Sequence, residues 1–214
     1  MALEVEFKYA LQDKPGSPEV TAALERAGFS VQPKGSRTQK DVYFDDASQT
    51  LARAGLALRQ RTVAEGEVDE EQLATLKVAG TVDGGLHQRE EIEVPMLAGW
   101  PEAVGERLRG IVEVSILEPS LTLYTERHRW LVAQNGEPLA ELSFDEVRAE
   151  RPGHAGGARF LELELEAIGG AAEDLRRIAG ALERGLSLTA NTLTKPARAR
   201  ALLGADKDGA DKDG

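Results

Sequence analysis

The first strand-like segment of the chain alternates strictly between apolar and charged positions. Over residues 3–9, apolar side chains at the odd positions alternate with Glu4, Glu6 and Lys8. In an extended chain, side chains two residues apart lie on the same face, about 7 Å from one another. The pattern therefore predicts a β-strand with one apolar face and one charged face.

The same design recurs in at least six later segments. Their polar faces comprise Arg59 and Arg61; Thr75 and Lys77; Arg89, Glu91 and Glu93; Thr125, Arg127 and Arg129; Glu141, Ser143 and Asp145; and Glu162, Glu164 and Glu166. A single strand of this kind is typical of the solvated side of an antiparallel sheet. So many charged faces also suit the inside of a closed barrel, where ligands and metal ions would complete the charge balance. Periodicity alone leaves both interpretations open.

Helical periodicity is confined to three stretches. We predict helices over residues 17–28, 101–108 and 175–185, the first opened by Ser17-Pro18 and the last ended by Gly185. The acidic stretch 65–71 and the glycine-rich stretch 151–158 are predicted to be loops.

Composition narrows the class of protein. The 214 residues include 26 Lys and Arg against 37 Asp and Glu, a net charge of −11, so we expect no nucleic acid or membrane partner. There is no cysteine and no apolar leader at the N-terminus, and the three histidines lack metal-ligand spacing. We expect a cytoplasmic protein in which any metal is bound by oxygen. Residues 204–214, which read GADKDGADKDG, are predicted to be a disordered tail after a domain spanning 1–203.

The ordered motifs resemble a known family. Glu4-x-Glu6-x-Lys8 resembles the ExExK signature of CYTH domains, the triphosphate tunnel metalloenzymes. It is followed in order by YFD at 43–45, GLALRQR at 55–61, TLK at 75–77, RxExE at 89–93, TxRxR at 125–129, Asp145, the Glu162/Glu164 strand and Lys195. The similarity extends over residues 1–203.

This resemblance implies a fold and an activity. The fold is α+β: a closed antiparallel eight-stranded β-barrel, open as a tunnel with a charged lumen, with helices packed outside. Family members bind triphosphate-containing small molecules in the lumen and hydrolyse the terminal phosphoanhydride with Mg²⁺ or Mn²⁺. Oxygen ligands suit these ions, and arginine forks suit phosphate.

Roles carry over by motif position. The catalytic group would be Glu4, Glu6, Lys8, Glu162 and Glu164. The substrate ligands would be Lys8, Arg59, Arg61, Lys77, Arg89, Arg127, Arg129 and Lys195. The metal ligands would be Glu4, Glu6, Asp145, Glu162 and Glu164. Glu91, Glu93, Glu141 and Glu166 are expected on the same face, and the gathered carboxylates should raise the pKa values of some of them.

Four functions fit these residues. Hydrolysis of inorganic triphosphate ranks first, because no base- or thiamine-recognition patch stands out in the sequence. The alternatives are a thiamine triphosphatase, a class IV adenylate cyclase and a non-catalytic polyphosphate-binding module. We expect a monomer or a small homo-oligomer. Tyr43 and Trp130 are interpreted as packing residues, and Asp45 and Asp46 as turn caps.

Overall fold

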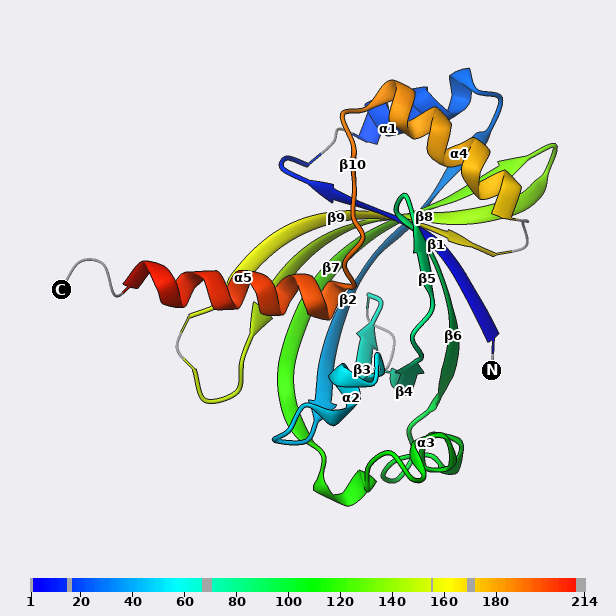
Figure 1. The fold of residues 1–214 in the computed structure, drawn as a ribbon. Coiled ribbons are helices and arrows are strands. Elements are labelled where there is room, and N and C mark those ends of the chain that lie inside the picture. Colours follow the sequence, from blue (N-terminus) through cyan, green and yellow to red (C-terminus); the bar gives the residue numbers. More distant parts are fainter. Residues whose placement is uncertain (1, 15–16, 67–70, 155, 169–171, 211–214) are drawn as a thin grey trace.

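The chain folds into a strongly curved antiparallel sheet that closes on itself, with helices around it (Figure 1). The structure is a computed structural model that describes residues 2–14, 17–66, 71–154, 156–168 and 172–210; the side chains of Ser17 and of residues 205–210 are outside this description. In chain order the elements are β1 (Ala2–Leu11), α1 (Ser17–Arg26), β2 (Ser30–Asp45), α2 (Thr50–Arg53), β3 (Ala57–Ala64), β4 (Glu71–Lys77), β5 (Thr81–Asp83), β6 (Leu86–Pro95), α3 (Glu102–Leu108), a 3₁₀ turn (Val114–Ile116), β7 (Glu118–Gln134), β8 (Glu137–Glu150), β9 (Ala158–Ala167), α4 (Ala172–Gly185), β10 (Thr189–Ala190) and α5 (Lys195–Ala210).

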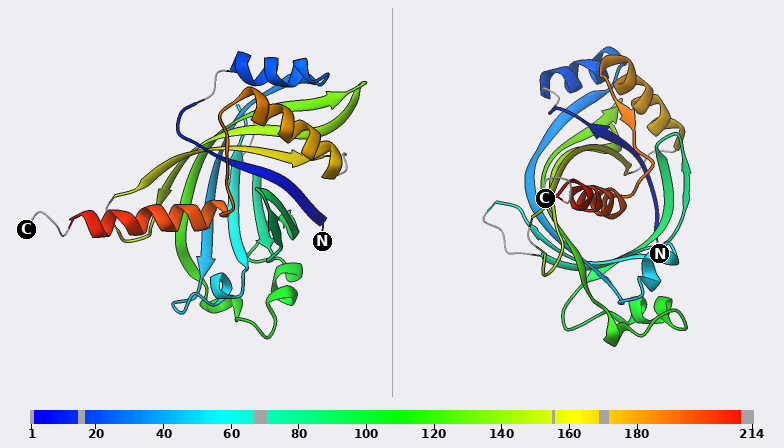
Figure 2. Two further views of the ribbon diagram at one scale, coloured as in Figure 1. Left: turned by 45° about the horizontal axis from the view of Figure 1, so that its top comes forward. Right: turned by 60° about the vertical axis from the view of Figure 1, so that its left-hand side comes forward.

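Within the described residues, eight strands form a closed ring. Their order is β1-β9-β8-β7-β2-β3-β4-β6, and β6 pairs back onto β1. Glu4 of β1 thus lies opposite Arg89 of β6, and Glu6 lies opposite Glu166 of β9. The right-hand view of Figure 2 looks into this ring. The predicted eight-stranded barrel is confirmed.

The charged faces of the strands point into the barrel. On β7, Thr125, Arg127 and Arg129 are buried, whereas Glu126 between them is exposed on the outer face. The alternation that left two interpretations open in the sequence therefore corresponds to a charged lumen rather than to a solvated sheet face.

The outer face of one half of the barrel is covered by α1 and α4. Leu24 of α1 and Leu175, Ile178 and Leu182 of α4 are fully buried. They belong to one apolar cluster with outward-facing strand residues, among them Phe7, Tyr9, Leu142, Leu163, Leu165 and, at its margin, Trp130. The predicted helices at 17–28 and 175–185 are confirmed, and Trp130 is a packing residue as expected.

A second cluster lies between the outer faces of β3 and β4 and the short helices α2 and α3. It contains Leu58, Leu76 and Leu108. The start of α2 is capped by two carboxylates: Asp45 accepts the N–H groups of Leu51 and Ala52, and Asp46 accepts that of Thr50. The capping role expected for Asp45 and Asp46 is confirmed.

Helix α5 starts at one end of the barrel and runs outward from it, and the right-hand view of Figure 2 shows it nearly end-on within the ring. Ala199, Leu202 and Leu203 pack on lumen-facing apolar side chains, namely Tyr43, Leu121, Leu123, Val147, Ala149 and Phe160. The lumen is therefore apolar at the α5 end and charged beyond it. The predicted tail begins inside α5, which extends to Ala210, and residues 211–214 lie outside the described part. Whether 204–214 is disordered stays a prediction.

No helix in the described ranges is both long and apolar enough to cross a lipid bilayer.

Leu182→Ala tests the α1/α4 cover. Leu182 has no exposed surface, so truncation should destabilise the protein by about 2–5 kcal/mol, the usual cost of a buried leucine cavity. The measurement is urea unfolding. Leu97→Ala is the control, because Leu97 is 94% exposed and its truncation should change stability little. Equal stabilities of the two variants would contradict this packing.

Candidate active site

A closed-in cavity of about 170 Å³ occupies the charged part of the lumen. We call it the lumen cavity. Its walls carry eight basic side chains: Lys8, Arg37, Arg59, Arg61, Lys77, Arg89, Arg127 and Lys195. They also carry six carboxylates: Glu4, Glu6, Glu91, Glu93, Glu164 and Glu166. The remaining lining is Tyr43, Ala57 and Pro196. This is a charged, oxygen- and nitrogen-rich site with little apolar surface.

Most of the side chains predicted from the motifs meet in this cavity. Ten of the thirteen line it: Glu4, Glu6, Lys8, Arg59, Arg61, Lys77, Arg89, Arg127, Glu164 and Lys195. Three do not. Asp145 and Glu162 are fully buried farther along the lumen, toward α5, and Arg129 lies beside the cavity, where its Nη2 donates to Glu65 at 2.5 Å.

The glutamates of β1 are bound by cations of β4 and β6. Lys77 Nζ donates to Glu4 Oε1 at 2.6 Å, and Arg89 donates to Glu4 Oε2 at 2.6 Å and to Glu6 Oε1 at 2.7 Å. Lys8 Nζ lies 3.1 Å from Glu6 and 2.8 Å from Glu164. Each carboxylate of the ExExK strand is therefore neutralised by a basic side chain.

Asp41 anchors the arginines on the opposite wall. Arg61 donates to both of its oxygens, at 2.7 and 2.8 Å, and Arg59 Nη1 lies 3.4 Å away. Asp41 is 1% exposed, so it acts as a buried counter-charge. The sequence interpretation missed Asp41 and Arg37, although the residue spacing of two along 37–43 carried the signal.

A third group ties β7, β8 and β9 to the start of α5. Arg127 donates to Asp145 at 2.7 and 2.5 Å and also contacts Glu164, while Lys195 Nζ contacts Asp145. Glu162 Oε1 accepts from Asn191 Nδ2 at 2.7 Å, whereas its buried Oε2 has no hydrogen-bond partner among the residues that the structure describes. Asp145 and Glu162 thus sit among the cations of the α5 end.

The register separates the predicted metal ligands into two places. Ala10 of β1 pairs with Glu162, so Glu4 lies six residues from the level of Glu162, about 20 Å along the strands. Glu6, by contrast, pairs with Glu166, and Lys8 pairs with Glu164. Glu4 and Glu162 are therefore too far apart along the strands to bind one ion, whereas Glu6, Glu164 and Glu166 lie at neighbouring levels.

Burial and neighbouring charges shift these carboxyl groups in opposite directions. Burial, with the charges of Glu6 and Glu4, raises the pKa of Glu166 to about 7. Burial also raises the pKa of Glu162. Although burial opposes it, Lys77 and Arg89 hold the pKa of Glu4 well below its usual range, and Lys195 and Lys8 do the same for Glu164. The rise in pKa expected for some of the gathered carboxylates thus occurs at Glu162 and Glu166, whereas Glu4 and Glu164 are held low by their cation partners.

The donor set fits a divalent cation by its chemistry. Glu4, Glu6, Glu164 and Glu166 offer only carboxylate oxygens, the ligands that Mg²⁺ and Mn²⁺ take. As the lumen stands, no three acidic or histidine side chains of the described residues are placed as a ready metal cage. Lysines and arginines hold the oxygens instead, so a cation would have to replace them.

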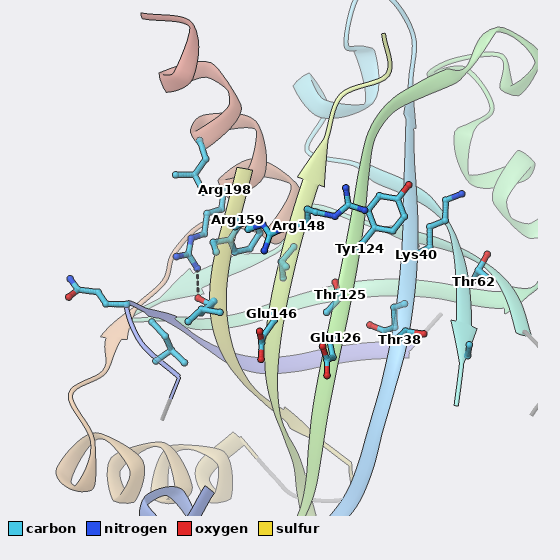
Figure 3. A pocket seen from close by; sticks show the side chains of 18 residues that line it. Thr38, Lys40, Thr62, Tyr124, Thr125, Glu126, Glu146, Arg148, Arg159 and Arg198 are labelled. Atoms are coloured by element: carbon cyan, nitrogen blue, oxygen red, sulfur yellow. Dashed lines mark hydrogen bonds between the residues drawn. The ribbon is translucent and has the colours of Figure 1, made fainter. Parts of the chain in front are cut away.

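A larger cavity of about 860 Å³ lies along β2, β7, β8 and β9 beside α5, and both inward- and outward-facing side chains line it (Figure 3). Lys40, Tyr124, Arg148 and Arg159 form a row across neighbouring strands there, beside Glu126 and the adjacent Glu146. Both signs of charge share this open surface, and of the motif residues that the structure describes, Thr125 alone lines it. We therefore place the candidate site in the lumen.

Glu166→Gln provides a test of the lumen electrostatics by pH. The pKa of Glu166 is raised from 4.5 to about 7 in the folded protein, so folding favours the protonated carboxyl group. The resulting contribution to the free energy of unfolding is fully present below pH 4.5 and is lost as pH rises through 7. Metal-free wild type should lose up to about 3 kcal/mol relative to Glu166→Gln between these limits.

Urea unfolding in chelator from pH 4.5 to 8 measures this difference. Glu90→Gln is the control, since Glu90 is exposed on the outer face of β6. If wild type and Glu166→Gln keep a constant stability difference across the range, Glu166 does not lie in this electrostatic environment.

Known proteins resemble the chain in sequence and in fold. The profile of the CYTH domain matches residues 2–195. The inorganic triphosphatase of Haemophilus influenzae is 27% identical, covering 82% of this chain and 48% of that protein. An uncharacterised protein of Mycobacterium tuberculosis is 30% identical, covering 97% of this chain and 41% of that one. The chain thus spans about half the length of these relatives, or less.

Solved structures share the barrel. A candidate adenylyl cyclase of Hippeastrum, described as having a dominant triphosphatase activity, superposes with a TM-score of 0.58 at 20% identity, covering 92% of this chain and 95% of that one. A candidate adenylate cyclase of Bacillus halodurans gives 0.57 at 19% identity, covering 92% and 98%. At these identities the likeness concerns the fold. With the profile match over nearly the whole length, it follows that the chain belongs to the CYTH domain family.

Proposed function

We propose that this chain is a metal-dependent triphosphatase that hydrolyses the terminal phosphoanhydride of inorganic triphosphate. The observation that supports it is the lumen cavity, where eight basic side chains face six carboxylates. In the ring, β1 and β2 are four strands apart in both directions, so the ExExK glutamates lie across the lumen from Arg37 and Asp41-bound Arg61. Cations on one wall suit phosphate oxygens, and carboxylates on the other suit a metal.

Similarity to the Haemophilus influenzae inorganic triphosphatase supports the same reaction. The small, charged lining supports an all-phosphate substrate, since Tyr43 is the one aromatic side chain named among the lumen cavity's described lining residues.

In the mechanism, the basic side chains bind and orient the phosphate chain. Lys77, Arg89 and Lys8 exchange their carboxylate partners for phosphate oxygens, which keeps the number of charge-assisted contacts roughly constant. A Mg²⁺ or Mn²⁺ ion held by Glu4, Glu6, Glu164 and Glu166 would neutralise phosphate charge and polarise the attacking water. Phosphoryl transfer depends mainly on positioning and charge stabilisation, so no protein nucleophile is required.

Asp145 and Glu162 have a different part in this proposal. They lie in the lumen beyond the cavity, on the side of α5, where Asp145 orients Arg127 and Lys195 toward the substrate. We therefore narrow the metal ligands to the four glutamates of β1 and β9 that line the cavity.

A neighbouring cavity favours a second candidate, an organic triphosphate such as thiamine triphosphate or ATP. It measures about 420 Å³ and shares Ala57, Lys77, Arg89 and Pro196 with the lumen cavity. Its other walls include the apolar side chains of Leu56, Val78 and Val82. The organic group of such a substrate could be accommodated there while its phosphates occupy the lumen.

A substrate panel tests the proposed function. Purified protein should release phosphate from inorganic triphosphate with Mg²⁺ or Mn²⁺. Chelation by EDTA should stop the reaction, because the proposed mechanism needs a divalent cation bound by the lumen carboxylates. The panel also contains thiamine triphosphate, ATP and longer polyphosphate, with cyclic AMP measured in parallel. Undiminished activity in EDTA would refute metal dependence, and exclusive formation of cyclic AMP would replace the triphosphatase by a cyclase.

Glu6→Gln and Glu162→Gln distinguish the two sets of predicted metal ligands. Glu6 lines the cavity, so its loss should raise the Mg²⁺ concentration for half-maximal activity about ten-fold or more, whereas Glu162→Gln should leave that concentration near the wild-type value. The measurement is activity against Mg²⁺ at saturating triphosphate. An equal increase in both variants would restore Glu162 to the metal site.

A further inference from the structure

Arg37 lines the lumen cavity but belongs to none of the motifs that suggested the site. It lies on β2, directly opposite Arg127 of β7 in the sheet register. Like charges at directly opposed positions destabilise a sheet, so this pair needs an explanation.

Arg37 differs from the other cations of the cavity in its partners. Lys8, Arg59, Arg61, Lys77, Arg89, Arg127 and Lys195 each have at least one carboxylate oxygen within 4 Å. Among the residues that the structure describes, Arg37 alone of the eight forms no ion pair. The charge of Glu141 acts on Arg37 and opposes the lowering of its pKa, but no ion pair joins the two within the described residues.

A neutral side chain holds Arg37 in place instead. With the amide of Gln39 turned so that its oxygen faces the guanidinium, that oxygen accepts from Nε at 3.0 Å and from Nη2 at 3.1 Å. Gln39 is 3% exposed, so this contact is buried. Gln39 thus orients the guanidinium and leaves its charge unbalanced.

The surroundings of Arg37 make that charge costly without a ligand. Burial, followed by the charges of Arg127, Arg129 and Arg61, lowers the pKa of Arg37 to about 10. An arginine whose pKa is lowered by its neighbours is one that an anion would stabilise.

We propose that Arg37 is a substrate-binding residue, kept free of carboxylates by Gln39, that binds phosphate oxygens from the wall opposite the ExExK strand. The inference rests on the proposed function, since the anion is the triphosphate chain. Each of the other seven cations already shares its charge with a carboxylate, whereas Arg37 can bind phosphate without any exchange of partners. Arg37 therefore contributes affinity that the paired cations cannot supply alone.

Three variants with the same change in net charge test the proposal. Arg37→Gln removes the cation, and Gln39→Glu keeps it but supplies a carboxylate at nearly unchanged side-chain volume. Lys40→Gln is the matched control, because Lys40 neighbours Gln39 on β2 but is exposed on the outer face. Each lowers the net charge by one.

Three measurements are made on each variant. They are the steady-state hydrolysis of inorganic triphosphate with Mg²⁺, the calorimetric binding of triphosphate with and without EDTA, and the melting temperature. Arg37→Gln and Gln39→Glu should each raise KM and weaken binding roughly ten-fold or more, with kcat changed far less. Arg37→Lys should restore part of the affinity, and Lys40→Gln should match wild type. Without ligand, Arg37→Gln and Gln39→Glu should melt no lower than wild type, because both relieve uncompensated positive charge.

The outcomes are separable. If wild type neither binds nor hydrolyses triphosphate, the proposed function fails and Arg37 has no phosphate to bind. If wild type does both and the two variants behave like Lys40→Gln, only the role of Arg37 is overturned. Lost affinity accompanied by a clear drop in ligand-free melting temperature would also overturn it, in favour of a structural role.

Discussion

Charge balance inside the closed barrel is the constraint on which the rest of this structure depends. Moving an ion from water into a protein interior costs several kcal/mol unless other groups compensate. The lumen meets this requirement by pairing strands: β1 glutamates with β4 and β6 cations, Asp41 with the β3 arginines, and Asp145 with Arg127 and Lys195. Each pair places a basic side chain beside a carboxylate. A metal ion could therefore bind the carboxylates while a phosphate chain binds the basic side chains, so that both ligands enter together. Either alone would leave half of each pair uncompensated.

The apolar clusters outside the barrel make such a lumen possible. Leu24, Ile178 and Leu182 pack on one half of the outer face, and Leu58, Leu76 and Leu108 on the other. Fully burying such a side chain contributes about 1.5–3 kcal/mol, so these clusters supply apolar burial that the charged part of the lumen does not. The arrangement inverts the usual one, in which the inside of a small barrel is the apolar core.

The alternation of apolar and charged residues along the strands determines how much of the structure could be predicted from the sequence. Alternation identifies the strands and the face on which each charge lies, and so nearly all of the cavity lining, including Glu166. It contains no information on register between strands distant in sequence. That is why Glu4 and Glu162, both predicted metal ligands, were grouped although the β1–β9 pairing separates them. Arg37 and Asp41 were missed because their strand begins with an irregular polar stretch around Pro33 and Gly35, where the β2–β7 register also shifts.

The closed end of the barrel is coupled to the ExExK strand through a short connection. Asn191, between β10 and α5, donates its backbone N–H to the Lys8 carbonyl at 2.8 Å and its Nδ2 to Glu162. Its own carbonyl lies 2.9 Å from Nε2 of the buried His87 on β6. Lys195 follows four residues later and contacts Asp145 from the first turn of α5. The helix that covers the apolar end of the lumen thus also delivers a cation to the cavity, and Asn191 fixes its start against the two strands that carry Lys8 and Glu164. Displacing α5 would remove Lys195 from Asp145 and open the lumen to water at once, so closure of the barrel end and completion of the cation set depend on the same contacts.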